Sequence, residues 1–173
     1  VQDGDSVELE PYTTLVEVEA VASDENATVE IAGAEDLQAG ENSLVVTVTA
    51  PNGDVAEYTV TLVVLLSADN SLATFTVNGD AVADGDTVEL EPYTTSVEVE
   101  AVASDENATV EIAGGSDLVA GENSLVVTVT APNGDVAEYT VTLVVLLSAD
   151  NSLATFTVNG QDVQDGDSVE LEP

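Results

Sequence analysis

The chain repeats itself with a fixed period of 81 residues, and this feature constrains its fold more than any other. The segment DGDSVELEP begins at Asp3 and again at Asp165, and DGDTVELEP begins at Asp84. Residues 1–81 and 82–162 differ at eight positions. The last eleven residues, VQDGDSVELEP, repeat the first eleven. The chain therefore contains two periods and the start of a third, and each period is expected to fold as the same unit.

Each period contains short segments in which apolar and polar residues alternate, which predicts half-buried β-strands. In the second period these are TSVEVEAVA, ATVEIAG, NSLVVTVTA and EYTVTLV, and a hairpin is expected in TFTVNGDAV. The Asn-Gly pairs at Asn78 and Asn133 suit tight turns. The aromatic residues recur at pattern positions typical of a core. Six or seven short strands in about 80 residues predict an all-β fold of tandem Ig-like β-sandwich repeats.

Several motifs of the period have a recognisable order. A Leu-rich first strand and a Gly turn precede Tyr93, which is followed by NATVEI, AGENSLVVTVTAPNG and AEYTVTL. In these motifs the chain resembles the cadherin-like β-sandwich repeat of bacterial extracellular surface and adhesin proteins. One departure is that Val144 and Val145 stand where that family often places an arginine. The resemblance implies an extracellular, array-forming structural or adhesive module without catalytic residues.

In that frame the chain divides into three parts. Residues 67–147 are expected to form a complete β-sandwich repeat, and residues 1–66 a repeat that lacks its first strand region. Residues 148–173 are expected to be the opening strands of a further repeat. The junction sequence VVLLSADNSL has no Pro or Gly and contains Leu65 and Leu66. Such an apolar junction favours stiff, abutting modules.

The charge of the chain has one sign. It contains 35 Asp and Glu and no Lys, Arg or His, for a formal net charge of −35, yet 44% of its residues are hydrophobic. The apolar content predicts a folded chain, because disordered acidic segments are poor in hydrophobic residues. Nucleic acid and anionic membranes are not expected partners, since both are bound through Lys and Arg. No apolar run approaches the ~18 residues of a membrane span. The expected partners are neighbouring identical repeats or chains.

The residue inventory also argues against catalysis. Without His, Cys, Lys or Arg, the chain lacks the usual bases, nucleophiles and anion clamps, and a carboxylate pair is the one catalytic arrangement that remains. The sequence therefore predicts a protein that is not an enzyme.

No signal peptide is recognisable at the N-terminus, which fits a mature segment or a fragment. The absence of Cys leaves the compartment open.

Calcium is the one cofactor that the sequence suggests. Hard cations prefer several oxygen ligands, and closely spaced carboxylates in loops supply them. The candidate ligands lie in the DGD turns and the junctions and are Asp3, Asp5, Asp69, Asp84, Asp86, Asp150, Asp165 and Asp167. The competing interpretation is that these are turn residues, with cations bound only diffusely. The NAT sequences at Asn26 and Asn107 match the N-glycosylation pattern.

The matching ends have two interpretations. The chain is either a window of a continuous array, or a unit whose residues 148–162 supply the strand missing from residues 1–66 of the next chain. The duplicated eleven residues would compete for one position in such a joint, which favours the window.

Together these features predict a structural repeat segment of a stalk, filament or adhesin at the cell surface, with end-to-end polymerisation by strand complementation as one mode of joining. The alternative is a Ca²⁺-dependent adhesion module that binds a glycan or protein. The acidic, nearly identical loops favour the structural function.

Overall fold

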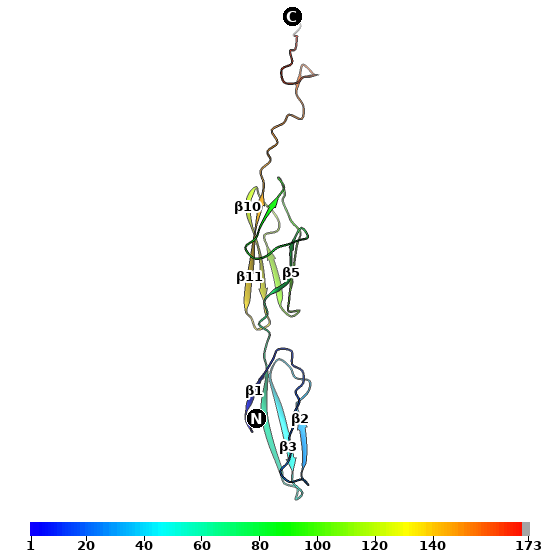
Figure 1. The fold of residues 1–173 in the computed structure, drawn as a ribbon, viewed down its shortest axis with the longest axis vertical. Coiled ribbons are helices and arrows are strands. Elements are labelled where there is room, and N and C mark those ends of the chain that lie inside the picture. Colours follow the sequence, from blue (N-terminus) through cyan, green and yellow to red (C-terminus); the bar gives the residue numbers. More distant parts are fainter. Residues whose placement is uncertain (171–173) are drawn as a thin grey trace.

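The computed structural model describes residues 1–170, and these form thirteen strands and no helix. Figure 1 shows an elongated molecule in which two strand-rich units follow each other along one axis, with a thin C-terminal segment beyond them. We call residues 1–66 the first unit, residues 67–147 the middle unit and residues 148–170 the C-terminal segment. The predicted all-β class is confirmed.

The first unit contains one sheet of four strands. These are β1 (Ser6–Leu9), β2 (Thr28–Ala32), β3 (Gly40–Thr49) and β4 (Val55–Val64), in the order β1-β4-β3-β2. β1 pairs with β4 in parallel, and the other neighbours are antiparallel. Strands β3 and β4 form a long hairpin, because valine and threonine alternate along both and the PNGD turn joins them.

The middle unit repeats this sheet. Its strands are β7 (Thr87–Leu90), β9 (Thr109–Ala113), β10 (Gly121–Thr130) and β11 (Val136–Val145), in the order β7-β11-β10-β9. Each strand begins 81 residues after its counterpart in the first unit. The strand directions also agree, with β7 parallel to β11 and the other pairs antiparallel.

A second sheet completes the middle unit. It consists of β5 (Leu72–Val77), β6 (Asp80–Ala81) and β8 (Val99–Ala103), in the order β6-β5-β8. The turn between β5 and β6 has φ values of 53° at Asn78 and 86° at Gly79, as the Asn-Gly pair predicts. The middle unit is therefore a two-layer β-sandwich of seven strands.

The first unit has no second sheet among the described residues. Residues 18–22 have the sequence of β8 but form no strand. In the middle unit β8 is held by pairing with β5, and the chain contains no copy of β5 ahead of residues 18–22. Strand formation here depends on the partner strand and not on the local sequence.

The C-terminal segment forms a small hairpin of β12 (Thr157–Val158) and β13 (Gln161–Asp162). This hairpin is a sheet by itself. In Figure 1 it stands clear of the middle unit, at the far end of the molecule from the first unit.

The two units differ in their cores. The core cluster of the middle unit contains ten buried hydrophobic side chains, which are Phe75, Val77, Leu90, Leu118, Leu125, Val127, Val129, Val141, Leu143 and Val145. The first unit buries five, which are Leu37, Leu44, Val60, Leu62 and Val64. The main sheets of the two units have nearly the same sequence. The difference in core size therefore comes from the second sheet, which covers the main sheet of the middle unit but not that of the first unit.

The aromatic residues do not all belong to the core, contrary to the sequence prediction. Phe75 is buried, but Tyr12, Tyr58, Tyr93 and Phe156 are 57, 48, 84 and 47% exposed. Tyr12 and Tyr93 lie in turns with positive φ, outside the strands, and Tyr58 and Phe156 lack the covering sheet. An aromatic residue that recurs at the same position of the repeat therefore has a different environment in each copy.

Candidate functional site

The predicted calcium ligands in the DGD turns bind the backbone. The Oδ1 atom of Asp3 accepts a hydrogen bond from the Thr59 N–H at 2.7 Å, and Asp5 accepts one from the Gln2 N–H at 2.6 Å. The middle unit repeats both bonds, through Asp84 at 2.7 Å and Asp86 at 2.8 Å. Asp3 and Asp84 therefore hold the turn to β4 and β11, and Asp5 and Asp86 close the turn itself.

The remaining candidates lie in similar turns. Asp69 accepts hydrogen bonds from the N–H and hydroxyl of Ser71, and Asp150 accepts the corresponding pair from Ser152. Asp167 accepts one from the Gln164 N–H at 2.7 Å. Within residues 1–170, no strand that corresponds to β4 or β11 follows Asp165. Among residues 1–170, no three His, Cys, Asp or Glu side chains are placed to share a metal ion.

The calcium prediction therefore stays a prediction, and thermal unfolding tests it. Because 35 carboxylates face no Lys or Arg, we expect NaCl to raise the unfolding midpoint by several degrees as it screens their repulsion. The turn bonds lead us to expect equal midpoints with Ca²⁺ and with a chelator when ionic strength is held constant. A higher midpoint in Ca²⁺ under that condition would instead indicate specific sites.

The contact between the units supplies a site that the sequence did not suggest. Tyr12, in a turn of the first unit, donates a hydrogen bond from its hydroxyl to Oδ2 of Asp105 in the middle unit at 2.5 Å. The backbone of Tyr12 has a φ of 65°. Asp105 begins the turn between β8 and β9, and its side chain is only 8% exposed. We call this contact, with Ser67 and Asn107 beside it, the junction site.

Asp105 is held as a carboxylate at the junction site. Hydrogen bonds from the Ser67 hydroxyl, the Tyr12 hydroxyl and the Asn107 backbone N–H lower the pKa of Asp105 from 3.8 to about 2. The same bond to Asp105, together with burial, raises the pKa of Tyr12. The tyrosine therefore stays protonated and the aspartate stays ionised over the whole neutral range. A charge-assisted hydrogen bond of this kind is stronger than a neutral one.

A backbone bond reinforces the junction. The Asn133 N–H, in the turn between β10 and β11, donates to the Ser67 carbonyl at 3.0 Å. Ser67, the first residue of the middle unit, is 7% exposed. The connection is therefore fastened to the base of the middle unit.

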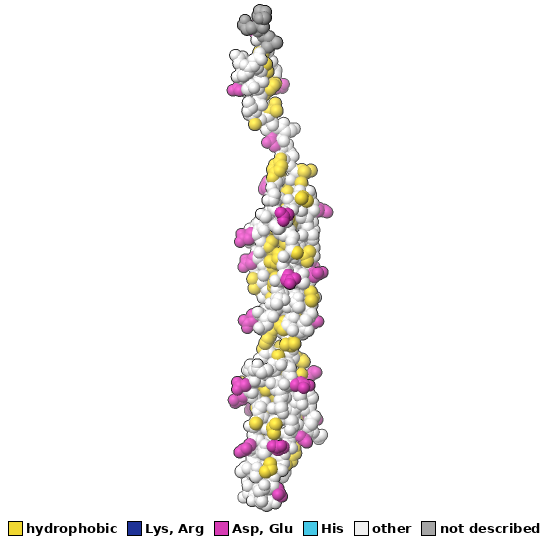
Figure 2. All heavy atoms as spheres, turned by 180° about the vertical axis from the view of Figure 1, so that it is seen from behind, with side chains coloured by type: hydrophobic (Ala, Val, Ile, Leu, Met, Phe, Trp, Pro, Cys, Tyr) yellow, Lys and Arg dark blue, Asp and Glu magenta, His cyan; other side chains and the backbone are white. Residues whose placement is uncertain are grey.

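The leucines of the connection are partly exposed. Leu65 and Leu66 are 42 and 53% exposed and line a shallow hollow of about 550 Å³ with Ala39, Gly40 and Asn133. On the face shown in Figure 2, hydrophobic side chains gather between the units, and acidic side chains are scattered over both. Polar bonds therefore contribute to the junction along with apolar contact.

Replacing Tyr12 by phenylalanine should raise the pKa of Asp105 from about 2 toward 3.8, because the hydrogen bond from the Tyr12 hydroxyl is lost. Because the folded protein lowers the pKa of Asp105, the ionised carboxylate stabilises the junction above pH ~4. This stabilisation is lost as the pH falls through the pKa that Asp105 has in the folded protein. The variant should lose it at a higher pH than the wild type. Carbon-detected NMR titration of the Asp105 carboxyl measures the shift.

The matched control is Tyr93→Phe. Tyr93 occupies the same position of the middle unit, but it is 84% exposed and its hydroxyl makes no hydrogen bond within residues 1–170. This variant should leave the titration of Asp105 unchanged. Equal shifts in both variants would contradict the assignment of the donor.

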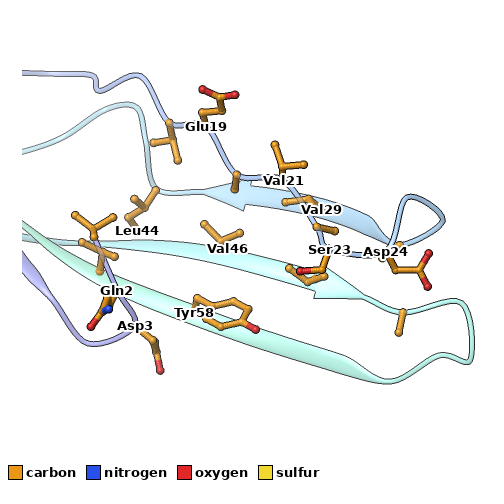
Figure 3. Close-up of a pocket in the computed structure, with 18 residues that line it drawn as sticks. Gln2, Asp3, Glu19, Val21, Ser23, Asp24, Val29, Leu44, Val46 and Tyr58 are labelled. Atoms are coloured by element: carbon orange, nitrogen blue, oxygen red, sulfur yellow. The ribbon is translucent and has the colours of Figure 1, made fainter.

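A second feature is an open groove in the first unit. It has a volume of about 740 Å³ and lies between residues 18–24 and the inner face of the sheet. Figure 3 shows Val46 and Tyr58 on the sheet side, with Val21 and Ser23 on the segment across from them. Its lining is mainly apolar, with Val48 and Val60 also contributing. The sequence predicted a missing strand here, but not which side chains its absence uncovers.

Comparison with known proteins gives no family assignment. No family model and no curated protein matches the chain. Solved structures with similarity include human mucin-like protocadherin EC1-2, at 12% identity over 86% of this chain and 98% of that chain, with a TM-score of 0.34. Protocadherin gammaB7 EC3-6 has 15% identity over 87% of this chain and 47% of that chain, with a TM-score of 0.31. The protocadherin gammaB4 extracellular domain has 17% identity over 84% of this chain and 32% of that chain, with a TM-score of 0.30. None of these similarities extends to function.

No helix among the described residues is long and apolar enough to cross a membrane.

Proposed function

We propose that this chain is a structural repeat segment of an extracellular stalk, filament or adhesin that extends away from a cell surface. Units are joined within a chain by the junction site and between chains by strand complementation. The observation that carries the proposal is the Tyr12–Asp105 bond at 2.5 Å, which ties one unit to the next. The bond between Asn133 and Ser67 fixes the first residue of the middle unit, directly after the connection. A connection that is fixed at its end and bridged by a side-chain bond bends less than a flexible linker.

The charge distribution supports the same function. Glu98, Glu100 and Glu111 point away from the core of the middle unit and are exposed. Like charges on the strand faces disfavour lateral pairing of near-identical units, since an uncovered sheet edge is otherwise a site of aggregation. A net charge of −35 also keeps an extended molecule soluble. End-to-end contact is thereby favoured over side-to-side contact.

Small-angle X-ray scattering of the dilute chain tests the proposal. We expect the wild type to scatter as a rod whose two units stay in line. Tyr12→Ala should widen the distribution of maximum dimensions, because the units can then bend about the connection. Tyr93→Ala, which alters the unpaired copy of the same tyrosine, should scatter like the wild type. A wild-type chain that already samples bent forms as freely as Tyr12→Ala would overturn the proposal.

A further inference from the structure

The groove of the first unit is half of a core. Val127 and Val129 on β10 are 0% exposed in the middle unit. Their counterparts on β3, Val46 and Val48, are only half-buried and line the groove. Both pairs of valines lie in the same local sequence. The difference in burial between the pairs therefore comes from the elements that pack over them.

In the middle unit the covering element is β5. It places Phe75 at 8% exposure and Val77 at 1% exposure against the main sheet. It also pairs with β8, with Phe75 opposite Ala101. The Tyr139 hydroxyl donates to the Asn70 carbonyl just ahead of β5, at 3.1 Å. Strand β5 thus fills the core and satisfies polar groups at its edge.

The C-terminal segment carries a second copy of β5. The sequence NSLATFTVNG occupies residues 70–79 and again residues 151–160. In the second copy Leu153 is 75% exposed and Phe156 is 47% exposed. Within residues 1–170, the hairpin it forms pairs with no other sheet. The side chains that fill the middle unit are therefore uncovered here.

The turn of this second copy already has the conformation of its counterpart in the middle unit, although β12 has two residues where β5 has six. The Val163 N–H donates to the Phe156 carbonyl at 2.9 Å, as the Val82 N–H donates to that of Phe75 at 3.0 Å. The Asn-Gly turns have φ values of 50° and 79° in one copy and 53° and 86° in the other. A preformed turn reduces the conformational freedom that the segment loses when it binds, which favours association.

We infer that a second copy of this chain inserts its residues 151–162 into the groove and supplies the missing sheet of the first unit. This rests on the proposed function, because it names the partner of the first unit in end-to-end assembly. With the register of β5 on β8, Phe156 lies opposite Ala20 of the acceptor. The acceptor's Tyr58 then donates to the carbonyl of the inserted Asn151, as its counterpart does in the middle unit.

The position of the two elements determines the form of the assembly. The groove lies in the first unit and the inserting segment lies beyond the middle unit, at opposite ends of the molecule (Figure 1). A joint that repeats the connection between the first and middle units places the two chains in line, so the contact is head-to-tail and open-ended. Each chain carries a charge of −35, and association should strengthen as salt screens the repulsion.

Two copies of one segment meet in this joint. Residues 163–170 follow the inserted hairpin and have the sequence of residues 1–8, which include most of β1 on β4. Only one copy can pair with β4 of the acceptor. Val169→Asp weakens the pairing of the inserting chain's residues 163–170 with β4 and leaves the acceptor's own residues 1–8 unchanged. Association should therefore be unchanged or stronger. Loss of association in this variant would place the contact in residues 163–170 and overturn the inference.

Sedimentation of the full chain over a wide range of concentration and salt is the main test. We expect a ladder of oligomers that grows with both. Phe156→Ser should weaken association on the order of a hundredfold, since a buried aromatic side chain is lost. Ala154→Ser is the matched control, because the counterpart Ala73 is exposed in the seated strand. It should associate like the wild type.

A peptide identifies the segment directly. The Phe156→Ser chain keeps its groove intact, so a synthetic peptide of residues 148–162 should bind it and slow amide exchange in residues 18–22. A peptide with serine in place of Phe156 should not. A wild-type chain that is strictly monomeric, or that stops at a closed dimer, would overturn the inference. Either result would also remove strand complementation from the proposed function. The joining of units within one chain would stand, because scattering from the monomer tests it separately.

Discussion

Phe75→Ala is expected to destabilise the middle unit by about 3–5 kcal/mol, the usual range for removing a buried phenylalanine from a core. Phe75 is 8% exposed and packs in the cluster that contains Leu125 and Val127. It lies on the central strand of the second sheet, so its loss weakens both the core and the hold on β8. Urea denaturation followed by circular dichroism measures the loss. Hydrogen exchange in β11 assigns the loss to the middle unit, because two units need not unfold in one step.

The chain contains its own control for this experiment. Phe156 lies in the same local sequence, NSLATFTVNG, but is 47% exposed. In dilute solution Phe156→Ala should change the stability by no more than about 0.5 kcal/mol, as is typical of surface positions. Similar losses in the two variants would show that Phe75 does not act through burial.

Gly114→Ala is expected to destabilise the middle unit by about 4 kcal/mol. Gly114 has a φ of 100°, and a Cβ atom there would overlap the carbonyl oxygen of Ser124 on the neighbouring strand β10. The cost combines a backbone conformation that is unfavourable for alanine with a steric clash against backbone that cannot move away. The midpoint of urea unfolding and the exchange rates of the β10 amides measure the effect.

Gly134→Ala separates the two contributions. Gly134 has a similar φ of 94°, but no heavy atom lies within 4 Å of the position of its Cβ. This variant should lose only about 1–2 kcal/mol, the cost of the backbone conformation. If both glycine variants lost the same amount, the close approach of Gly114 to β10 would have no energetic consequence.

The strands of the middle unit could be predicted closely from the alternation of residues. EYTVTLV lies within β11 and NSLVVTVTA covers most of β10, and the Asn-Gly turn at Asn78 has the positive φ expected of it. Glu98 and Glu100 are exposed while Val97 and Val99 are partly buried. These predictions succeed because the pleat of a strand places successive side chains on opposite faces.

Alternation predicted burial less well at the edges. The alternation in ATVEIAG places Ile112 on the same inward face as Val110, yet Ile112 is 46% exposed. It lies on β9, the outer strand of the main sheet, where the second layer covers less of the surface.

The positions of the calcium candidates followed from the sequence, but their hydrogen bonds did not, because Asp3 and Thr59 are far apart along the chain.

The junction site had no clear signal in the sequence. Tyr12 and Asp105 are separated by 93 positions, and their counterparts Tyr93 and Asp24 are exposed and do not meet within this chain. A tyrosine that recurs outside the alternating segments was the one available indication. Its partner becomes visible once the two units are placed end to end.

The amino-acid sequence alone establishes the 81-residue period, the strand segments and the uniform negative charge, because these depend on local composition and on the two-residue periodicity of a strand. The three-dimensional arrangement establishes which copy of each residue is buried. Val46 and Val127 have the same neighbours in the chain, but only Val127 has β5 above it. Burial is a property of what packs against a side chain, and packing across a core joins residues that local sequence does not connect.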